Sequence, residues 1–305
     1  MDKRKKKRRI TQVLAALLTN ANLPGFFKGK IYHGKLKTGC VPGLNCYSCP
    51  GAVGACPIGA MQAVLGSRKY NFAFYVVGFL SLLGVIFGRF ICGWLCAFGL
   101  IQDLLYKIPT PKLKFNQKPD HILRYLKYVV LAVFVLLLPI FLVDEFGISP
   151  PYFCKYVCPV GTLEGGIQLV LLNKSLQNTI GFLFGWKFFL MASILISSIF
   201  ICRPFCKYIC PLGAFYALFN RISFIKIRVD EKKCTSCGLC AKKCKMGVDV
   251  KKTPNNAECI RCGGCVNACP HNALHMGLDQ SGKVIKTKES SLLKVISDPS
   301  KAYHD

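Results

Sequence analysis

The chain has 305 residues, of which 52% are hydrophobic, and a formal net charge of +27 at pH 7. Its long apolar runs exclude an ordinary soluble enzyme, because runs of this kind are membrane spans by default. The basic residues flank these runs and form no groove with interleaved aromatic residues, which argues against a nucleic-acid partner. We therefore expect a protein embedded in a lipid membrane, with its charge explained by the positive-inside rule and by attraction to anionic head groups.

The first segment, residues 1–27, is predicted to be a basic N-terminus followed by a membrane anchor. The sequence MDKRKKKRR precedes the apolar run Ile10–Phe27. This order resembles a signal peptide, but no convincing small-residue cleavage site follows it. We expect an uncleaved anchor with the basic residues in the cytoplasm.

Residues 28–225 are predicted to form the membrane domain. A Gly- and Lys-rich loop over residues 28–69 is too irregular to cross a bilayer. The apolar runs Tyr70–Ile91, Tyr128–Val143 and Phe182–Ile201 follow it. With the anchor, they predict an α-helical integral membrane protein with about four transmembrane helices.

A short motif recurs four times in this domain and consists of cysteine, usually proline, any residue, glycine and an apolar run. The copies begin at Cys56, Cys96, Cys158 and Cys210, and Ala97 replaces proline in the second. Proline after the cysteine suits the first turn of a helix, whose free N–H groups would point at an anionic cluster. One span separates consecutive copies, so the first and third should share one membrane face and the second and fourth the other. The pattern predicts a parallel internal repeat.

Each face then holds two motifs that could bind one [4Fe–4S] cluster. Membrane cysteines are often packing residues, and the outer set could form disulfides, so we expect one or two membrane clusters. Cys46 and Cys202 are alternates to the assigned ligands, and Cys40 is spare. The predicted ligands are Cys92, Cys96, Cys206 and Cys210 for the inner cluster and Cys49, Cys56, Cys154 and Cys158 for the outer cluster.

Residues 226–277 carry the strongest cofactor motif, and a polar tail, residues 278–305, follows. The pattern C-x2-C-x2-C-x3-C occurs twice, and Pro270 closes the second copy. At this spacing three cysteines bind one cluster and the fourth reaches the other, as in bacterial-type two-cluster ferredoxins. A zinc ribbon would lack the third C-x2 step. We predict a small α+β ferredoxin domain with one cluster on Cys234, Cys237, Cys240 and Cys269 and the other on Cys259, Cys262, Cys265 and Cys244.

Charge and the ferredoxin motif set the expected orientation. The connector 107–127 and the N-terminus are basic and favour the cytoplasm for the second and fourth motifs, whereas the basic loop 28–69 argues against this. Clusters of a chain without an export signal are most simply assembled in the cytoplasm, so we place the ferredoxin domain there, on the inner membrane. No membrane haem is expected, because the histidines lie outside the predicted spans, at His33, His121, His271, His275 and His304.

The segments GRFICGWLC and CRPFCKYICPLGA, together with the double ferredoxin motif, resemble the NapH-like family of membrane polyferredoxins. That family includes the quinol-dehydrogenase partner of periplasmic nitrate reductase. The C-terminal domains of nitrous-oxide-reductase regulators and the copper-reducing oxidase assembly proteins are similar. The resemblance covers residues 70–275 and implies a multi-span protein that passes electrons through [4Fe–4S] clusters. The motif at residues 45–60 is not part of the pattern of the nitrate-reductase member.

We expect an electron carrier, or a subunit of a quinol dehydrogenase, in place of a stand-alone enzyme with catalytic residues of its own. Electrons would pass between a cytoplasmic redox partner and either quinone or an extracytoplasmic acceptor. The hydrocarbon core is ~30 Å thick, so clusters at opposite faces would have to lie within the bilayer or be bridged. The alternative is a metal-reducing maturation or regulatory factor for a respiratory metalloenzyme, with Cys40 and Cys46 as metal-handling thiols.

Overall fold

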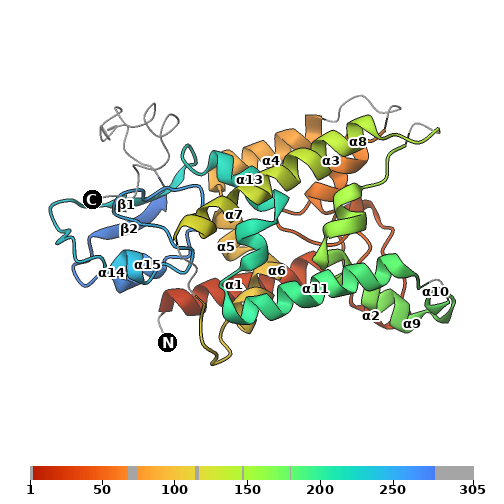
Figure 1. The fold of residues 1–305 in the computed structure, drawn as a ribbon, viewed down its shortest axis with the longest axis horizontal. Helices are drawn as coiled ribbons and strands as arrows, with labels where there is room; N and C mark the ends of the chain where they lie inside the picture. Colours follow the sequence, from red (N-terminus) through yellow and green to blue (C-terminus); the bar gives the residue numbers. More distant parts are fainter. Residues whose placement is uncertain (1–2, 68–73, 114–116, 146–147, 179, 279–305) are drawn as a thin grey trace.

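The computed structural model describes residues 3–67, 74–113, 117–145, 148–178 and 180–278. Within them the chain forms an elongated helical bundle with a small two-stranded domain at one end (Figure 1). The first residues of the expected span Tyr70–Ile91 lie outside the described residues, as does the expected tail apart from Leu278.

Short helices alternate with long ones along the chain. The elements in order are α1 (Lys3–Thr19), α2 (Leu23–Lys28), a 3-10 turn (Lys35–Thr38), α3 (Pro57–Leu65), α4 (Phe74–Phe87), α5 (Phe90–Trp94), α6 (Ala97–Leu105), α7 (Gln117–Val130), a π-helix (Leu131–Leu137), α8 (Leu138–Phe141), two π-helical turns (Phe153–Val157 and Gly161–Gly166), α9 (Ile167–Leu172), α10 (Lys174–Gln177), α11 (Phe182–Phe200), α12 (Pro204–Tyr208), α13 (Pro211–Phe219), β1 (Ile225–Val229), α14 (Leu239–Lys242), α15 (Gly264–Ala268) and β2 (Leu274–Leu278).

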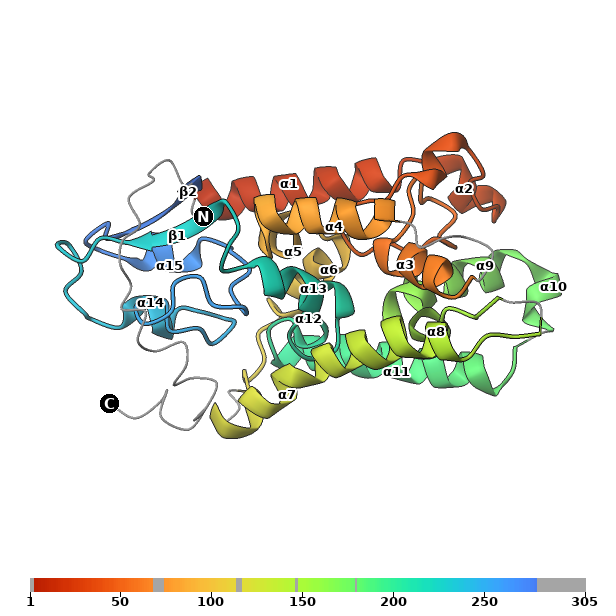
Figure 2. The ribbon, with the colours of Figure 1, turned by 90° about the horizontal axis from the view of Figure 1, so that it is seen from above.

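The long helices surround the short ones that follow the cysteine motifs. Helix α6 packs against α1 and α11, and α13 packs against α4 and α7 (Figure 2). Helix α12 lies between α7 and α11. The core of the bundle is therefore built from the helices that begin at or carry cysteines, and the longer helices enclose it.

Two helical segments are long and apolar enough to cross a membrane, Pro119–Phe141 and Phe182–Phe200. Only 28% and 17% of their apolar windows are buried in the protein, so most of their apolar side chains face outward. The core helix of a soluble protein would show the opposite. Shorter apolar helices occupy Tyr75–Phe87 and Gly161–Leu172. The segments expected over Tyr128–Val143 and Phe182–Ile201 are thus helical, and the full set of four spans stays a prediction.

The segment expected to form one anchor, Ile10–Phe27, is not one helix. Helix α1 begins in the basic cluster and ends at Thr19, and α2 starts only at Leu23. The side-chain amide of Asn20 donates to the Ala16 carbonyl at 3.1 Å, which competes with continuation of the helix. Pro24 then occupies the first turn of α2 and lacks the N–H needed to extend α1.

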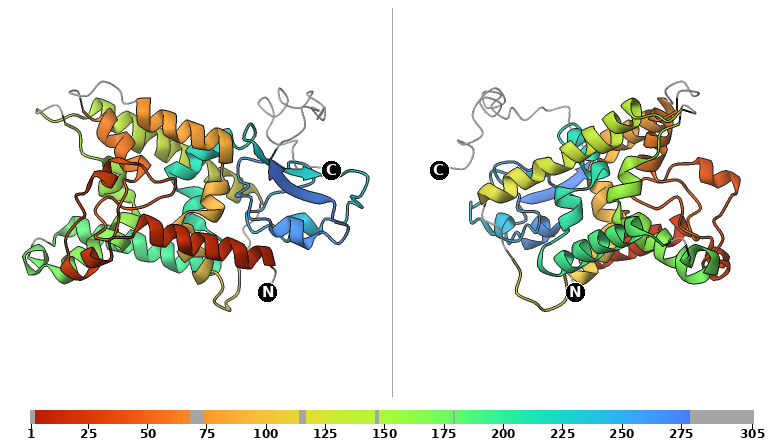
Figure 3. Two further views of the ribbon diagram at one scale, coloured as in Figure 1. Left: turned by 180° about the vertical axis from the view of Figure 1, so that it is seen from behind. Right: turned by 45° about the vertical axis from the view of Figure 1, so that its right-hand side comes forward.

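The small domain has the α+β form predicted for a ferredoxin. Strands β1 and β2 pair antiparallel, from Ile225 opposite Leu278 to Val229 opposite Leu274, and α15 packs on β2 and α14. Figure 3 shows this domain beyond one end of the bundle, beside the N-terminus of α1. An added Cβ at Gly263 would lie 2.8 Å from the Arg4 side chain, so the basic N-terminus contacts the domain directly.

Candidate iron–sulfur sites

The first ferredoxin site is a cavity of about 160 Å³ at the outer end of the domain. Helix α14 follows Gly238, whose φ of 70° is in the left-handed region that favours glycine. The Ala273 N–H lies 3.3 Å from the Cys269 sulfur, the kind of bond that favours a thiolate. Cys237 is exposed. The cavity is lined by all four predicted ligands, Cys234, Cys237, Cys240 and Cys269, and this donor set fits a [4Fe–4S] cluster.

The second ferredoxin site lies on the side of the domain that faces the bundle. The thiol of Cys265 interacts electrostatically with those of Cys259, Cys262 and Cys244. The Val248 N–H donates to the Cys244 sulfur at 3.4 Å. Cys244 belongs to the first motif and Cys269 to the second, so the fold brings each fourth cysteine to the other motif's site, as the spacing predicts.

The inner membrane site is formed by two pairs of cysteines at the centre of the bundle. Cys92 and Cys206 lie in α5 and α12, and Cys96 and Cys210 are the N-cap residues of α6 and α13. All four are buried, and the Cys210 thiol interacts electrostatically with the other three. The fold therefore unites cysteines separated by more than a hundred residues.

Two N–H groups donate hydrogen bonds to cysteine sulfurs at this site. The Gly213 N–H in the first turn of α13 donates to the Cys210 sulfur at 3.3 Å. The side-chain amide of Gln102 donates to the Cys206 sulfur at 3.2 Å. The first contact explains the Cys-Pro-x-Gly motif, since the thiol caps the helix and the glycine supplies an otherwise unpaired N–H. Gln102 is not among the predicted site residues, although a glutamine stands six residues after both Cys56 and Cys96.

Buried positive charge surrounds the inner site. Arg89 and Arg203 are fully buried, and they donate to the carbonyls of Cys206 at 3.0 Å and of Cys92 at 2.5 Å, respectively. Arg203 also binds Asp103 through two bonds of 2.9 and 2.7 Å. A cluster held by four thiolates is anionic, so these cations fit its charge.

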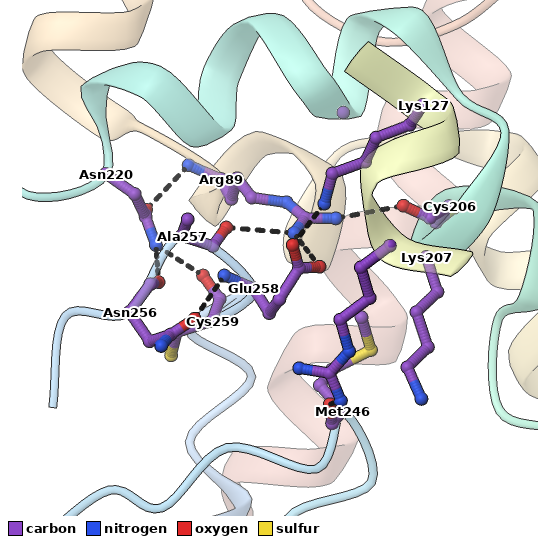
Figure 4. Close-up of polar contacts among 12 residues, drawn as sticks. Arg89, Lys127, Cys206, Lys207, Asn220, Met246, Asn256, Ala257, Glu258 and Cys259 are labelled. Atoms are coloured by element: carbon purple, nitrogen blue, oxygen red, sulfur yellow. Dashed lines mark hydrogen bonds and ion pairs between the residues drawn. The ribbon is translucent and has the colours of Figure 1, made fainter. Parts of the chain in front are cut away.

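Three acidic residues in this region each form ion pairs with two basic residues. Glu258 pairs with Arg89 at 2.8 Å and with Lys127 (Figure 4). Burial alone would raise the pKa of Glu258, but attraction to Arg89 and Lys127 outweighs it, and the pKa lies below its ordinary value. The remaining pairs are Arg8 and Arg203 on Asp103, and Arg124 and Lys207 on Asp120. These six basic and three acidic groups leave a surplus of positive charge beside the inner site.

The ferredoxin domain docks on the inner site through backbone contacts. A Cβ at Gly93 would lie 2.2 Å from the Ile260 carbonyl oxygen, so only glycine fits there. The Trp94 indole donates to the Arg261 carbonyl at 3.0 Å. Consecutive Cα atoms are ~3.8 Å apart, so the Cα atoms of Cys92 and Cys259 lie at most about 14 Å apart.

The same interface is fixed by hydrogen bonds to the end of α13. The side-chain amide of Asn220 donates to the Cys259 carbonyl at 3.0 Å, and its oxygen accepts from the Arg89 N–H at 3.1 Å (Figure 4). Arg261 donates to the carbonyls of Phe87 and Asn220 at 2.7 and 2.6 Å. The domain is therefore held rigidly on the bundle.

The outer group lies farther from the ferredoxin domain, around α3 (Figures 1 and 2). Cys56 is the N-cap residue of α3, and Cys154 and Cys158 lie in and after the π-helical turn 153–157. The thiols of Cys154 and Cys56 interact electrostatically, as do those of Cys158 and Cys154. Three of the four cysteines expected here thus come together.

The structure brings Cys46, not Cys49, to this group. The Cys46 thiol interacts electrostatically with Cys158 and Cys56. Residues 46–49 form a turn closed by the Cys49 N–H and the Cys46 carbonyl at 3.1 Å, and the Cys49 thiol points to the Asn20 side-chain oxygen at 3.6 Å. Cys46, which the sequence predicts as an alternate ligand, therefore occupies the place expected for Cys49.

The other spare cysteines lie outside the two groups. Cys202 is buried beside Asp103 and Lys245. Its thiol also interacts electrostatically with Cys262 of the second ferredoxin site. Cys40 forms a β-bridge with Ala55. All cysteines of the chain fall within the described residues, and all are free thiols there. Over the described residues, no three His, Cys, Asp or Glu side chains converge as around a single metal ion. The ligands of a cubane bind separate iron atoms and stand farther apart.

The loop before α3 connects the inner and outer groups. A Cβ at Gly43 would lie 3.3 Å from the Cys96 Cα, and the Tyr216 hydroxyl donates to the Pro42 carbonyl at 2.9 Å. Since consecutive Cα atoms are ~3.8 Å apart, Cys96 and Cys46 lie at most about 16 Å apart, Cα to Cα. That is about half the hydrocarbon thickness of ~30 Å.

A two-motif ferredoxin domain docked on a cysteine-lined helical bundle defines an iron–sulfur protein of the electron-transport class. The family described as "4Fe-4S binding domain" matches residues 70–116, 128–177 and 183–229, and a second family with that description matches residues 253–275. Each of the three bundle matches contains one pair of motif cysteines.

Several curated proteins are similar to the chain. The uncharacterized protein MJ0750 of Methanocaldococcus jannaschii is 33% identical over 64% of this chain and 74% of its own length. The putative electron transport protein YccM of Escherichia coli is 28% identical over 62% and 51%, respectively. The regulatory protein NosR of Stutzerimonas stutzeri is 29% identical over 61% of this chain but only 25% of its own length. No solved structure matches the chain.

The chain therefore belongs to the family of 4Fe-4S binding proteins of the ferredoxin type. Its relatives include electron transport and ferredoxin-type proteins by name. The narrower NapH-like assignment stays a prediction from the motifs.

Proposed function

We propose that this protein is a membrane-bound electron carrier that passes electrons between a redox partner at the ferredoxin domain and quinone or an acceptor at the far end of the bundle. A [4Fe–4S] cluster, when bound, accepts and donates one electron with little rearrangement. The observation that carries the proposal is the docking of Gly93 on Ile260, which brings the second ferredoxin site next to the inner site.

The order of the sites along the molecule supports transfer along its long axis. The exposed first ferredoxin site, the second site, the inner site and the outer group follow one another from one end to the other (Figure 1). Buried contacts enclose the inner site, which keeps water away from its four thiols. The chain's own contribution is thus to hold the sites in series and to supply charge and N–H donors to each.

A membrane location is supported by the outward apolar faces of Pro119–Phe141 and Phe182–Phe200, which run along the same axis (Figure 2). The basic N-terminus and the Lys112 end of the connector lie at the ferredoxin end, where Lys112 donates to the Ile199 carbonyl at 2.9 Å. Positive residues at this end support a cytoplasmic location for it by the positive-inside rule.

The partner at the ferredoxin domain is proposed to be a soluble redox protein with an acidic surface. The first site is open to solvent at Cys237, and exposed lysines stand on both sides of its motif, whereas Glu231 and Asp249 are the exposed acids nearby in the described sequence. The lysines are Lys232, Lys233, Lys242, Lys243, Lys245, Lys251 and Lys252. Such a surface accelerates the encounter with an oppositely charged partner.

The alternative role in metal reduction would use spare thiols at the far end. Cys49 is only 1% exposed, and Cys40 is partly buried. One partly exposed thiol does not make a metal site, so the electron-carrier function is the one that the geometry supports best.

The proposal is tested in sealed vesicles that contain the purified protein and trapped ferricyanide, which does not cross the bilayer. A reduced, acidic ferredoxin is added outside, and bleaching of ferricyanide is followed. Cys206→Ala should abolish the bleaching while the ferredoxin-domain clusters remain reducible. Equal bleaching by the variant and the original protein would contradict transfer through the inner site.

A further inference from the structure

The outer cysteine group repeats the inner site in its hydrogen bonding. The side-chain amide of Gln62 donates to the Cys154 sulfur at 3.4 Å, just as Gln102 donates to Cys206 at 3.2 Å. Both glutamines are fully buried and lie six residues after the cysteine that caps their helix. A buried amide that is directed at sulfur in both places indicates that both groups are built for the same ligand.

The helix starts of the two groups also correspond. Cys56 is the N-cap residue of α3, as Cys96 is of α6, and a Cβ on Gly59 would lie 3.9 Å from the Cys154 sulfur. Gly161 stands three residues after Cys158, as Gly213, whose N–H donates to the Cys210 sulfur, stands three residues after Cys210. The N–H groups of a helix start stabilise a negative sulfur.

Only the fourth ligand differs between the groups. The inner site has Cys92 four residues before Cys96, but the equivalent outer position is Ala52. The Cys46 sulfur instead lies 3.4 Å from the position of a Cβ on Gly165 and 3.8 Å from that on Gly161. It therefore faces the π-helical turn 161–166, which begins three residues after Cys158.

The surroundings of this fourth cysteine are held in place. The Cys46 N–H donates to the Glu164 carboxylate at 3.0 Å, which fixes the loop to the π-helical turn 161–166. Lys187 reaches the group from α11, with its nitrogen 3.9 Å from the Cβ position of Gly161 and an attraction to Cys154. A cation there suits an anionic cluster, and Cys49 is turned away toward Asn20.

We propose that Cys46, Cys56, Cys154 and Cys158 hold a second membrane [4Fe–4S] cluster and that Cys49 is not a ligand. This inference rests on the proposed electron-carrier function only for its role as the last site in the series. The ligand set itself stands on the correspondence with the inner site.

The test compares Cys46→Ala with the matched variant Cys49→Ala, both purified anaerobically as the full chain. Iron and acid-labile sulfide are measured per chain, and reduced-state EPR spectra are recorded. Cys46→Ala should lose about 4 iron atoms relative to the unaltered protein, because one cubane is lost, and Cys49→Ala should lose none. Signals from the ferredoxin domain in the same samples report that each variant is folded.

Loss of iron in Cys49→Ala with full iron in Cys46→Ala would overturn the assignment, as would full iron in both. The vesicle assay separates this inference from the proposed function. If the iron content follows the expected pattern but no electrons reach trapped ferricyanide, the ligand set is confirmed and the proposed carrier function is wrong. If electrons cross equally well in Cys46→Ala, the outer cluster is not part of the path.

Discussion

The side-chain amide of Gln102 lies 3.2 Å from the Cys206 sulfur, and Gln62 stands in the same relation to Cys154 at 3.4 Å. Each glutamine comes from the helix capped by one cysteine and reaches a cysteine of the partner motif. The contact therefore ties together the two halves of each cysteine group. It also places an N–H donor on sulfur, which is one of the means by which proteins set cluster potentials.

Replacing either glutamine should change the reduction potential of one membrane cluster only. Gln102→Leu should lower the potential of the inner cluster, because an N–H···S bond stabilises the more negative, reduced state. Gln62→Leu should do the same to the outer cluster only. EPR-monitored redox titrations measure both, and each variant is the control for the other. An unchanged midpoint in both variants would show that these bonds do not act on the clusters.

The docking of the ferredoxin domain should depend on the lack of a side chain at residue 93. Gly93→Ala would place a Cβ 2.2 Å from the Ile260 carbonyl oxygen and force the domain away from α5. We expect full iron content but much slower electron transfer from the ferredoxin clusters to the inner cluster, measured by rapid-freeze EPR. Gly277→Ala is the control, since nothing lies within 4 Å of its Cβ position. Equal rates in both variants would contradict the assigned interface.

The buried carboxylate of Glu258 should be needed for stability. Glu258→Gln would leave Arg89 and Lys127 buried without their counter-charge, and breaking such a pair costs about 3–5 kcal/mol. We expect a lower midpoint of thermal unfolding and faster proteolytic release of the ferredoxin domain. Asp230→Asn is the control, because its pair with Lys233 is exposed and 3.8 Å long, and such pairs contribute little. Comparable losses in the two variants would count against the buried charge network.

If the partner is acidic, the rate at which it reduces this protein should depend strongly on the salt concentration. The rate of reduction by an acidic ferredoxin should fall as ionic strength rises, and the double variant Lys242→Glu, Lys243→Glu should lower it further. Reduction by dithionite should not distinguish the variant from the original protein. Lys28→Glu, Lys30→Glu changes the same charge at exposed residues of α2 and its following loop, at the other end of the bundle, and serves as the control. A salt-independent rate would exclude an acidic partner at this face.

The ferredoxin domain was predictable from sequence because its ligands are local. Fixed spacings of two and three residues decide which thiols can share a cluster, and the exchange of Cys244 and Cys269 between sites follows from the same spacing. The pairing of the first motif with the third and of the second with the fourth could also be predicted, since one apolar run separates consecutive motifs.

The fourth outer cysteine could not be chosen in the same way. Cys46 and Cys49 are three residues apart, and the turn between them decides which thiol faces Cys158. That turn is held by Glu164, which is more than a hundred residues away in the chain. The predicted anchor Ile10–Phe27 is wrong for a related reason, because the apolar run continues past Asn20 although the helix ends at Thr19. Gln62 and Gln102 could have been predicted from the sequence, because each stands six residues after a motif cysteine.

The most direct test of the series of sites is the iron and acid-labile sulfide content of the anaerobically purified chain, combined with reduced-state EPR. Four [4Fe–4S] clusters correspond to about 16 iron atoms per chain, and we predict this value with interacting signals from neighbouring clusters. A content of about 8 iron atoms, with only the ferredoxin-domain signals, would contradict both membrane sites and leave the cysteine groups of the bundle as packing.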